Sequence, residues 1–364
     1  MTIGSWSQPL LGTSNPEFPA GAQAVAAAIN RAGGLNGRQL EVIACSDELN
    51  PEVARQCARE AVRLGVVAVV GLQTFNETAV LPVLEAAGIP AIGVYPFTDS
   101  ALTNPISFPL TSGFMGQNIG MGLQLARHGA AKIRVVVPGG MGAISTEISR
   151  GVERGALAGN ATYAGLVQIP ARSLDLSPVV AAATADDASV AGLAVDEAEL
   201  VRSVRALAPK AMIATFPFNL TDNVLRSTGA RAEGVLSVEG FLPPSADVPG
   251  TRLYRRQLQA FDPSLPVSAT GLHEWLAMRT FVKVASRLSS LTAGNLLAAM
   301  NEVRDLDMEG LTPPFSARKQ PGRYSRLFNS TVVFQTVRSG RIVLNDGQAS
   351  PFVEIGPLLR ANVP

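Results

Sequence analysis

The chain has few of the residues on which metalloenzymes and nucleic-acid-binding proteins depend. Only two of its 364 residues are histidine, 16% are charged, and the formal net charge is +1. A zinc site needs several ligating side chains close together, and nucleic-acid binding needs a basic stripe. The composition therefore argues against both classes, while a hydrophobic content of 47% is typical of a globular protein.

Long hydrophobic runs are also missing. No apolar run approaches the roughly 20 residues that span a bilayer. The opening MTIGSWSQPL has neither the basic region nor the apolar region of a signal peptide. A chain of this length favours two domains over one.

Cysteine is rare, and the two that occur lie close in sequence. Cys45 ends an apparent strand, and Cys57 lies on the second turn of a helix that starts near Pro51, so the two are within bridging reach. A disulfide that closes so short a loop would stabilise the fold by about 3 kcal/mol. It would also indicate an exported protein. Two ordinary buried thiols are the alternative.

Short apolar runs alternate with helical patterns along most of the chain. Continuous Val, Ile and Ala runs predict strands that are buried on both faces of a parallel sheet. One strand–helix series fills residues 1–95 and a second fills 113–239, joined by a linking stretch at 104–112. Three helices without strands follow at 250–304. The chain closes with STVVFQTV, SG and RIVL, which predict a hairpin with a two-residue turn.

The helices at 250–304 need a sheet to cover, and the first series can supply one. We therefore expect two lobes, one formed by residues 1–111 plus 242–326 and the other by 112–241 plus 327–364. The predicted fold is α/β, with two Rossmann-like lobes whose parallel sheets are joined by three hinge crossovers. Ligands of open α/β sheets bind at the carboxyl ends of the strands, so we expect a cleft there.

Several stretches resemble a known family. Residues 27–71 (AAINRAGGLNGRQLEVIACSDELNPEVARQCAREAVRLGVVAVVG), 81–92 (LPVLEAAGIPAI) and 230–244 (ARAEGVLSVEGFLPP) resemble the leucine/isoleucine/valine-binding type of solute-binding protein. These are type I periplasmic binding proteins, the extracytoplasmic receptors of ABC importers. The resemblance implies a clamshell that closes on a small-molecule ligand and presents it to an ABC permease in the membrane.

The same resemblance implies a monomer with no cofactor and no nucleic-acid partner. It places the protein in the periplasm or on a lipid anchor at the outer face of the cell membrane, with the signal segment absent from this chain. A ligand-sensing regulatory protein of the same fold is the alternative.

One stretch invites a different interpretation, because VVVPGGMGAIS (135–145) combines a strand, a glycine turn and a helix start. Dinucleotide-binding units begin in this way. However, Ser145 stands where a third glycine should be, and the next strand ends in Gln168 and Pro170 without an acidic residue. We therefore interpret the turn as a cleft loop and expect no cofactor.

The chain departs from the family at several ligand-binding positions. Thr98 matches the family's threonine, but Phe75 replaces a serine, Thr13 replaces an aromatic residue and Met141 replaces a tyrosine. The loop TFPFN (215–219) holds no carboxylate where the family has an acid for the ligand ammonium. An ammonium buried without a counter-charge is costly, so an ordinary amino acid is not the expected ligand.

The remaining candidates are mostly apolar and aromatic. Phe216 and Phe218 follow a strand end, and the proline between them is expected to turn both rings outward. His273 opens a helix whose start approaches the ligand in the family. Such a lining suits a largely apolar or aromatic ligand, including a carboxylate or an amino-acid derivative. The predicted ligand-binding residues are Trp6, Thr13, Thr74, Phe75, Asn76, Phe97, Thr98, Met141, Phe216, Phe218 and His273.

No catalytic residues are predicted. The chain lacks the G-x-S-x-G, H-E-x-x-H and G-x-x-x-x-G-K patterns of hydrolases, metalloproteases and nucleotide-binding enzymes. His128 lies just before a glycine that ends a helix and is expected to interact with the last helical carbonyls. We therefore expect a binding protein and not an enzyme.

Overall fold

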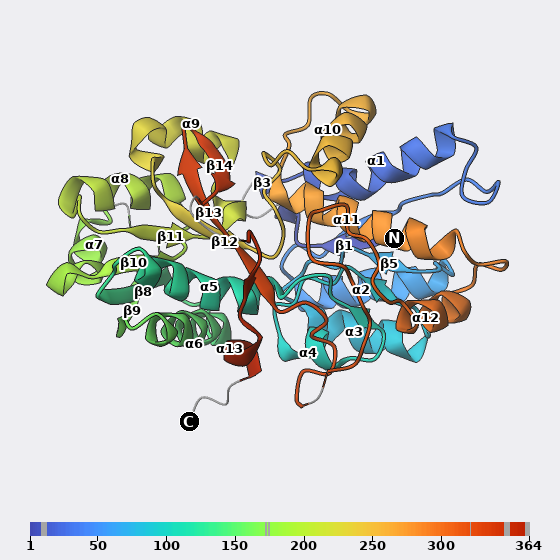
Figure 1. The fold of residues 1–364 in the computed structure, drawn as a ribbon, viewed down its shortest axis with the longest axis horizontal. Helices are drawn as coiled ribbons and strands as arrows, with labels where there is room; N and C mark the ends of the chain where they lie inside the picture. The colour runs from blue at the N-terminus through green and yellow to red at the C-terminus, as the bar shows by residue number, and fades with distance from the viewer. Residues whose placement is uncertain (9–12, 172, 174, 321, 346–349, 361–364) are drawn as a thin grey trace. The chain divides into compact units, whose positions relative to one another are not determined.

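The chain forms two compact units, shown in Figure 1. The computed structural model describes residues 1–8, 13–171, 173, 175–320, 322–345 and 350–360. Unit 1 consists of Met1–Gly113 and Asp247–Asn329, and unit 2 of Phe114–Ala246 and Ser330–Pro364. The chain therefore crosses from one unit to the other three times.

Unit 1 is built on a parallel sheet in the order β4-β1-β5-β6-β7. Two short sheets join because the Val70 N–H donates to the Met1 carbonyl at 2.8 Å and the Gln73 N–H donates to the Ile3 carbonyl at 3.1 Å. The strands are β1 (Thr2–Gly4), β4 (Ala44–Ser46), β5 (Val69–Val70), β6 (Ala91–Ile92) and β7 (Ser107–Phe108), with a separate antiparallel pair β2 (Ser7–Gln8) and β3 (Thr13–Ser14). The prediction of a plain linker at 104–112 is wrong, because β7 lies there. Strand β7 has only two residues, Ser107 and Phe108, between Pro105 and Pro109, and so short a strand shows no recognisable sequence pattern.

Helices cover both faces of the unit 1 sheet (Figure 1). Helices α1, α10 and α11 pack together, and α11 lies on β5 and β6, while α2 and α3 pack together against the other face. The expectation that the helices after residue 250 cover the first sheet is thus confirmed for α11. The helices are α1 (Glu17–Arg31), α2 (Pro51–Arg63), α3 (Glu77–Ala86), α4 (Asp99–Thr103), α10 (Pro249–Phe261), α11 (Ala269–Ala285) and α12 (Ala293–Asn301).

Local sequence explains how two of these helices begin and pack. Pro51 is the first residue of α2, and the Asn50 side chain accepts hydrogen bonds from the Glu52 and Val53 N–H groups. Gly21 of α1 touches α11 so closely that a Cβ there would lie 2.0 Å from the carbonyl oxygen of Gly271. Only glycine allows this approach of the two helices.

Unit 2 contains a larger sheet in the order β9-β8-β10-β11-β12-β13-β14, in which β15 also pairs with β13. Strands β8 to β12 are parallel, and β13 and β14 are antiparallel. Ser339 and Gly340 both have positive φ, as a type I′ turn requires, so the predicted hairpin is confirmed. The strands are β8 (Lys132–Pro138), β9 (Thr162–Ile169), β10 (Ser189–Gly192), β11 (Ile213–Thr215), β12 (Leu236–Glu239), β13 (Thr331–Arg338), β14 (Arg341–Leu344) and β15 (Val353–Glu354).

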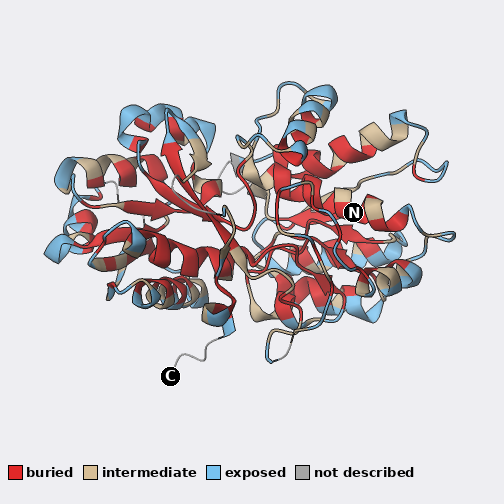
Figure 2. Ribbon diagram, in the orientation of Figure 1, coloured by how far each residue is buried: buried red, intermediate tan, exposed pale blue. Residues whose placement is uncertain are grey.

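The sheet of unit 2 also lies between two groups of helices. Helices α5 and α6 pack against each other, and α7, α8 and α9 form a contiguous row on the other face (Figure 1). Figure 2 shows the strands largely buried and the outer faces of the helices exposed. The α-helices are α5 (Gly113–Arg127), α6 (Ala143–Ala158), α7 (Ser177–Ala183), α8 (Glu197–Leu207), α9 (Asp222–Thr228) and α13 (Gly356–Arg360), and the 3-10 turns are η2 (Ala185–Asp187), η3 (Pro217–Asn219) and η4 (Gly229–Ala232).

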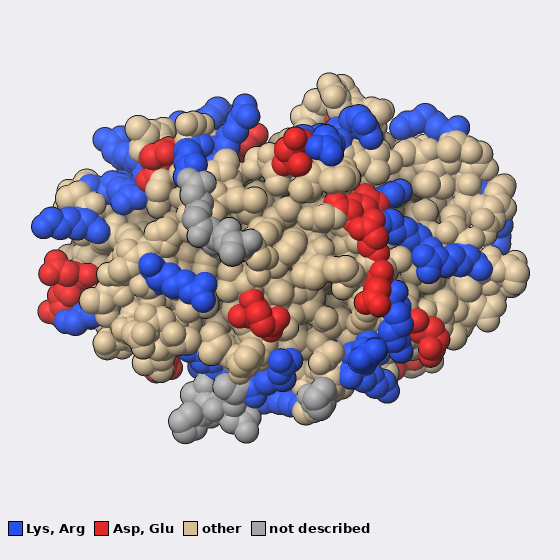
Figure 3. Space-filling view, in the orientation of Figure 1, with Lys and Arg blue, Asp and Glu red and all other residues tan. Residues whose placement is uncertain are grey.

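Charged side chains are scattered over the surface. On the face drawn in Figure 3, Lys and Arg are interspersed with Asp and Glu, and most of that surface is uncharged. Within the described residues, no helix is both long enough and apolar enough to cross a membrane.

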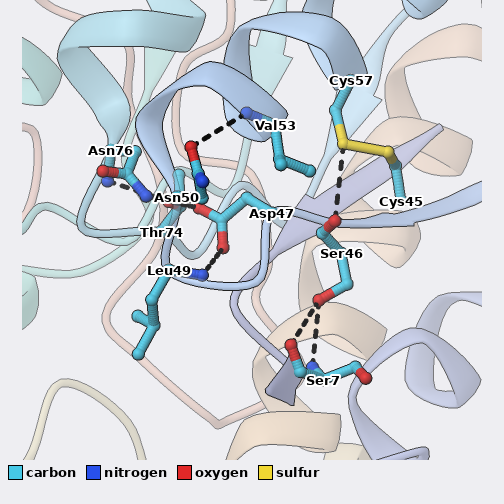
Figure 4. The surroundings of a disulfide bond; sticks show 10 residues. All are labelled: Ser7, Cys45, Ser46, Asp47, Leu49, Asn50, Val53, Cys57, Thr74 and Asn76. Carbon is cyan, nitrogen blue, oxygen red and sulfur yellow. Dashed lines mark hydrogen bonds between the residues drawn. A yellow bond between two sulfur atoms is a disulfide. The ribbon is translucent and has the colours of Figure 1, made fainter. Parts of the chain in front are cut away.

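The predicted disulfide is confirmed. Cys45 of β4 and Cys57 of α2 are bonded, with their Cα atoms 5.9 Å apart (Figure 4). Cys57 is buried in the core formed by α2, α3 and the sheet of unit 1. The bridge therefore ties an edge strand to the helix that covers it.

Candidate ligand-binding site

Most of the predicted site residues lie in loops at the carboxyl ends of neighbouring parallel strands. In unit 1 the loops that follow β1, β5 and β6 carry Trp6, Thr74–Asn76 and Phe97–Thr98. In unit 2 the loops that follow β8 and β11 carry Met141 and Phe216–Phe218. Because the carboxyl ends of parallel strands meet at one edge of a sheet, each unit gathers its candidates there.

An aromatic pair dominates the unit 1 loops. The rings of Phe75 and Phe97 have their centroids 4.1 Å apart and are inclined at 41°. Phe97 is buried and also contacts Tyr95, with centroids 5.2 Å apart. Phe75 is partly exposed, so it is the member of the pair that can offer a face to a ligand.

Thr74 and Asn76, two predicted polar contacts, are engaged with a buried carboxylate (Figure 4). The Thr74 hydroxyl and the Asn76 side-chain amide both donate to Oδ2 of Asp47, the latter at 3.0 Å. The Asp47 Oδ1 accepts the Leu49 N–H at 3.0 Å, and Thr74 Oγ1 accepts the Asn76 N–H at 2.9 Å. These side chains hold the loops of β4 and β5 together, which sequence reasoning did not foresee.

Thr98 has a similar structural role. Its N–H and its hydroxyl donate to Glu77 Oε2 at 2.9 and 2.7 Å, and the Phe97 N–H donates to Oε1 at 2.8 Å. Glu77 is fully buried, and burial raises its pKa to about 8 although the hydrogen bonds from Thr98 and Phe97 act to lower it. Thr98 Oγ1 also accepts the Ser100 N–H at the start of α4.

Three other polar atoms at the carboxyl edge of unit 1 are buried without a hydrogen-bond partner among the described residues. They are the Ser5 hydroxyl, the Trp6 Nε1–H and the Gln73 side-chain oxygen. Ser5 and Gln73 are adjacent, because the Ser5 N–H donates to the Gln73 carbonyl at 3.1 Å. Buried polar atoms are normally paired, so these three atoms are candidates for contact with a ligand. Thr13 lies in β3, and its side chain lies outside the described residues.

In unit 2, Phe216 does not point outward as predicted. Its side chain is 0% exposed and is stacked between Phe114, with centroids 4.9 Å apart, and Phe218, at 5.0 Å. Phe216 directly follows β11, whose residues are all buried, whereas Pro217 starts the 3-10 turn that brings Phe218 to a partly exposed position. The prediction is therefore wrong for Phe216, and Phe218 is the ring on the accessible side of the stack.

Two aliphatic side chains extend the apolar surface at this edge. Met141, in the loop between β8 and α6, is partly exposed. Val195 follows β10, which lies between β8 and β11, and its side chain is 87% exposed. Sequence reasoning missed Val195, although an apolar residue just past a strand end is the same signal that identified Met141.

A buried glutamate lies beside the TFPFN loop. Glu197, the first residue of α8, accepts the Ala194 N–H at 2.9 Å and the Asn219 side-chain amide at 3.2 Å. It is 3% exposed, and burial raises its pKa to about 7. The loop that lacks a carboxylate of its own is therefore bonded to one from the preceding helix.

The histidines lie elsewhere. His273 is 1% exposed on α11, its ring meets the Tyr95 ring edge-on with centroids 5.2 Å apart, and burial lowers its pKa to about 3. It is a neutral, buried residue on the unit 1 helix that covers β5 and β6, and its place in the ligand-binding set stays a prediction. His128 Nε2 lies 2.7 Å from the side-chain amide of Asn345, so its partner is not the end of α5. No cluster of metal-ligating side chains occurs in the described part of the chain.

This fold, with its loops gathered at strand ends, is that of a type I solute-binding protein. A family model described as periplasmic binding protein matches residues 9–340, and the chain belongs to that family. No curated protein matches the chain.

Solved structures share the fold along nearly the whole chain. A branched-chain amino acid ABC transporter protein from Thermus thermophilus with bound valine is 15% identical, with coverage of 99% of this chain and 96% of that one and a TM-score of 0.77. A fatty acid ABC transporter substrate-binding protein from Thermomonospora curvata is 17% identical, with coverage of 100% and 94% and a TM-score of 0.78. A solute-binding protein from R. palustris in complex with 4-hydroxybenzoate is 18% identical, with coverage of 97% and 95% and a TM-score of 0.73. At sequence identities of 15% to 18%, these similarities show that the fold is shared and nothing about the ligand.

Proposed function

We propose that this protein is the extracytoplasmic solute-binding component of an ABC importer and that its ligand is a small, largely apolar or aromatic carboxylate. The observation that carries the proposal is the character of the strand-end loops. These loops carry the partly or fully exposed apolar side chains of Phe75, Met141, Val195 and Phe218. The predicted polar contacts Thr74, Asn76 and Thr98 are instead engaged with buried carboxyl groups of the protein.

The apolar surface that unit 1 can offer to a ligand is Phe75, and the surface that unit 2 can offer consists of Met141, Val195 and Phe218. An aromatic ring that buries its surface against such side chains gains about 25 cal/mol per Å², which amounts to a few kcal/mol. Aromatic and aliphatic linings of this kind are typical of sites for apolar ligands.

The polar end of the ligand meets the unpartnered trio of Ser5, Trp6 and Gln73. The Trp6 Nε1–H can only donate and the Ser5 hydroxyl can donate, so these two suit a carboxylate or a phenolic oxygen, whereas the Gln73 side-chain oxygen accepts and suits a ligand hydroxyl or N–H group. An α-ammonium group finds no free carboxylate as a counter-charge among the buried acids of these loops. Asp47 and Glu77 are buried and accept their hydrogen bonds from the protein, and burial disfavours a negative charge on Glu197.

Two further features support an exported, importer-linked role. The Cys45–Cys57 disulfide is typical of proteins that fold in an oxidising compartment. The chain passes between the two units three times, at residues 113–114, 246–247 and 329–330, and we propose that these links act as the hinge for ligand-driven closure. The valine, fatty acid and 4-hydroxybenzoate named for proteins of the same fold show that this fold accommodates different ligands.

A ligand panel tests the proposal. Calorimetry and thermal shift would compare 4-hydroxybenzoate, benzoate, phenylacetate and octanoate with leucine, isoleucine and valine. We expect at least one of the four apolar acids to bind and raise the melting temperature, because a ligand selective for the folded state stabilises it. Micromolar binding of leucine with no binding of these acids would refute the ligand class.

Two variants locate the ligand. Phe218→Ala should weaken binding tenfold or more, which is about 1.4 kcal/mol, whereas Leu157→Ala, an exposed truncation on α6 (60% exposed), should leave it unchanged. Trp6→Phe keeps an aromatic ring but removes the indole N–H, so it should weaken binding of carboxylates tenfold or more. Unchanged affinity in both Phe218→Ala and Trp6→Phe would remove these loops from the site.

A further inference from the structure

Each unit contains a buried glutamate in the same position relative to its sheet. Glu77 is the first residue of α3, the helix that follows β5, and Glu197 is the first residue of α8, the helix that follows β10. Glu77 is 0% exposed and Glu197 is 3% exposed. Both reach sideways to the loop that follows the next strand of the sheet, which is β6 in unit 1 and β11 in unit 2.

In unit 1 the glutamate binds the loop before α4 through both carboxyl oxygens. Oε1 accepts the Phe97 N–H at 2.8 Å, and Oε2 accepts the Thr98 N–H at 2.9 Å and the Thr98 hydroxyl at 2.7 Å. The Phe97 ring is the support on which Phe75 packs. The carboxyl group of Glu77 therefore fixes the backbone of Phe97 and Thr98, and with it the position of the Phe97 ring on which Phe75 packs.

In unit 2 the contact is made to a side chain of the aromatic loop. Glu197 Oε2 accepts the Asn219 side-chain amide at 3.2 Å, and it also accepts the Ala194 N–H at 2.9 Å from the loop that carries Val195. One carboxyl group thus connects the Val195 loop to the turn that presents Phe218.

We infer that Glu77 and Glu197 are paired positioning residues, one for each unit, which hold the apolar strand-end loops in the arrangement that the ligand meets. The inference rests on the proposed function for the identity of those loops. Neither residue needs to touch the ligand, because each acts on it through the backbone or side chain of a neighbouring loop.

The chemistry requires a carboxyl group at position 77, because both of its oxygens accept N–H groups. Glutamine at position 77 has the same shape, but its NH₂ group would face an N–H donor and leave that donor buried without a partner. At position 197 only Oε2 accepts hydrogen bonds from the described residues, so a test there must remove the whole carboxyl group. Burial raises the pKa of Glu77, and the hydrogen bonds donated by Thr98 and Phe97 act to lower it. Burial also raises the pKa of Glu197, and the negative charge of Asp196 raises it further.

Amide hydrogen exchange on the ligand-free protein tests the positioning role directly. Glu77→Gln should lower the protection of the Phe97 and Thr98 amides about tenfold or more and leave Ala194 unchanged, and Glu197→Ala, which removes the acceptor, should do the reverse. The matched controls are Glu85→Gln on α3 and Glu199→Gln on α8, which leave the two loop contacts intact. Neither control should alter the three amides.

The pH profile supplies a readout that a purely structural role would not move. Because burial raises the Glu77 pKa, ionisation disfavours the closed loop relative to a solvent-exposed one, so protection of Phe97 and Thr98 in the wild type should fall as pH rises toward about 8. Protection of Ala194 should fall as pH rises toward about 7. These steps should vanish in the corresponding variant. The wild-type profile needs no variant to fold, so it remains informative if a substitution prevents folding.

Binding of 4-hydroxybenzoate by the same proteins separates this inference from the proposed function. If the wild type binds, Glu77→Gln and Glu197→Ala should each bind at least tenfold more weakly while the controls bind normally. If the wild type does not bind 4-hydroxybenzoate but the variants lose hydrogen-exchange protection at their loop amides, the positioning role stands and the choice of ligand is wrong. Loop amides that keep full protection in both variants, with a flat wild-type pH profile, would overturn the inference.

Discussion

Removal of the Cys45–Cys57 disulfide should destabilise unit 1 by an amount that the sequence separation sets. The bond closes a loop across 12 positions of sequence. In the chain-entropy account, a cross-link of this span removes about 3 kcal/mol of conformational freedom from the unfolded chain at 25 °C. The double variant Cys45→Ala/Cys57→Ala should therefore lose about 3 kcal/mol of unfolding free energy, plus a smaller packing loss at the buried Cys57.

Tryptophan fluorescence during urea unfolding measures this loss in the correct unit. The chain has two tryptophans, Trp6 and Trp275, and both belong to unit 1. With a urea dependence typical of small domains, 3 kcal/mol corresponds to a midpoint that is lower by about 1 M or more. Wild-type protein treated with a reductant should show nearly the same decrease, because it loses the same cross-link without any change in side-chain volume.

Two results would contradict this reasoning. Titration of two free thiols in denatured, unreduced protein made in an oxidising compartment would show that the bond is absent. Equal urea midpoints for the oxidised, reduced and double-variant proteins would show that the cross-link does not restrict the unfolded chain as calculated.

Two further perturbations test the interior of unit 1. Gly71→Ala should destabilise strongly, because Gly71 has φ +65° and a Cβ there would lie 1.8 Å from the buried Glu274 carboxyl oxygen. Gly65→Ala, at φ +62° with no atom within 4 Å, should cost only the backbone strain of about 1–2 kcal/mol, and equal urea midpoints for the two variants would refute the clash. The raised pKa of Glu77 predicts that its contribution to stability is fully present below pH 4.5 and is lost as pH rises through about 8. At about 1.4 kcal/mol per pH unit, the loss is on the order of 5 kcal/mol. Wild type should therefore lose more stability than Glu77→Gln between pH 5 and pH 8, and parallel curves would contradict the pKa.

The sequence alone was sufficient for the features that depend on short-range pattern. Alternating apolar runs and helical periods predicted the strand–helix order, and the Ser339–Gly340 turn predicted the hairpin that completes the sheet of unit 2. The spacing of Cys45 and Cys57 predicted the disulfide because it depends only on one strand and the helix that follows it. These features record burial and chain geometry over a few residues, so they can be read locally.

The candidate site could be predicted only in part. Strand ends were correctly expected to carry Phe75, Met141 and Phe218, because the carboxyl edge of a parallel sheet follows from strand order. The burial of Phe216 was missed because it depends on Phe114, which lies about a hundred residues earlier and supplies the ring on which Phe216 stacks. The exposure of Val195 was missed for a related reason, since its position depends on where β10 ends.

Only the tertiary structure decided which polar groups are available to a ligand. Thr74 and Thr98 carry the hydroxyls that a binding site would use, yet Asp47 and Glu77 engage them from other loops. Those partners are 27 and 21 residues away along the chain. A hydrogen bond forms between groups that the sheet order brings within 3 Å, and no local pattern encodes that order. The sequence thus determined the fold and the position of the loops, while long-range packing determined which of their side chains remain free to bind.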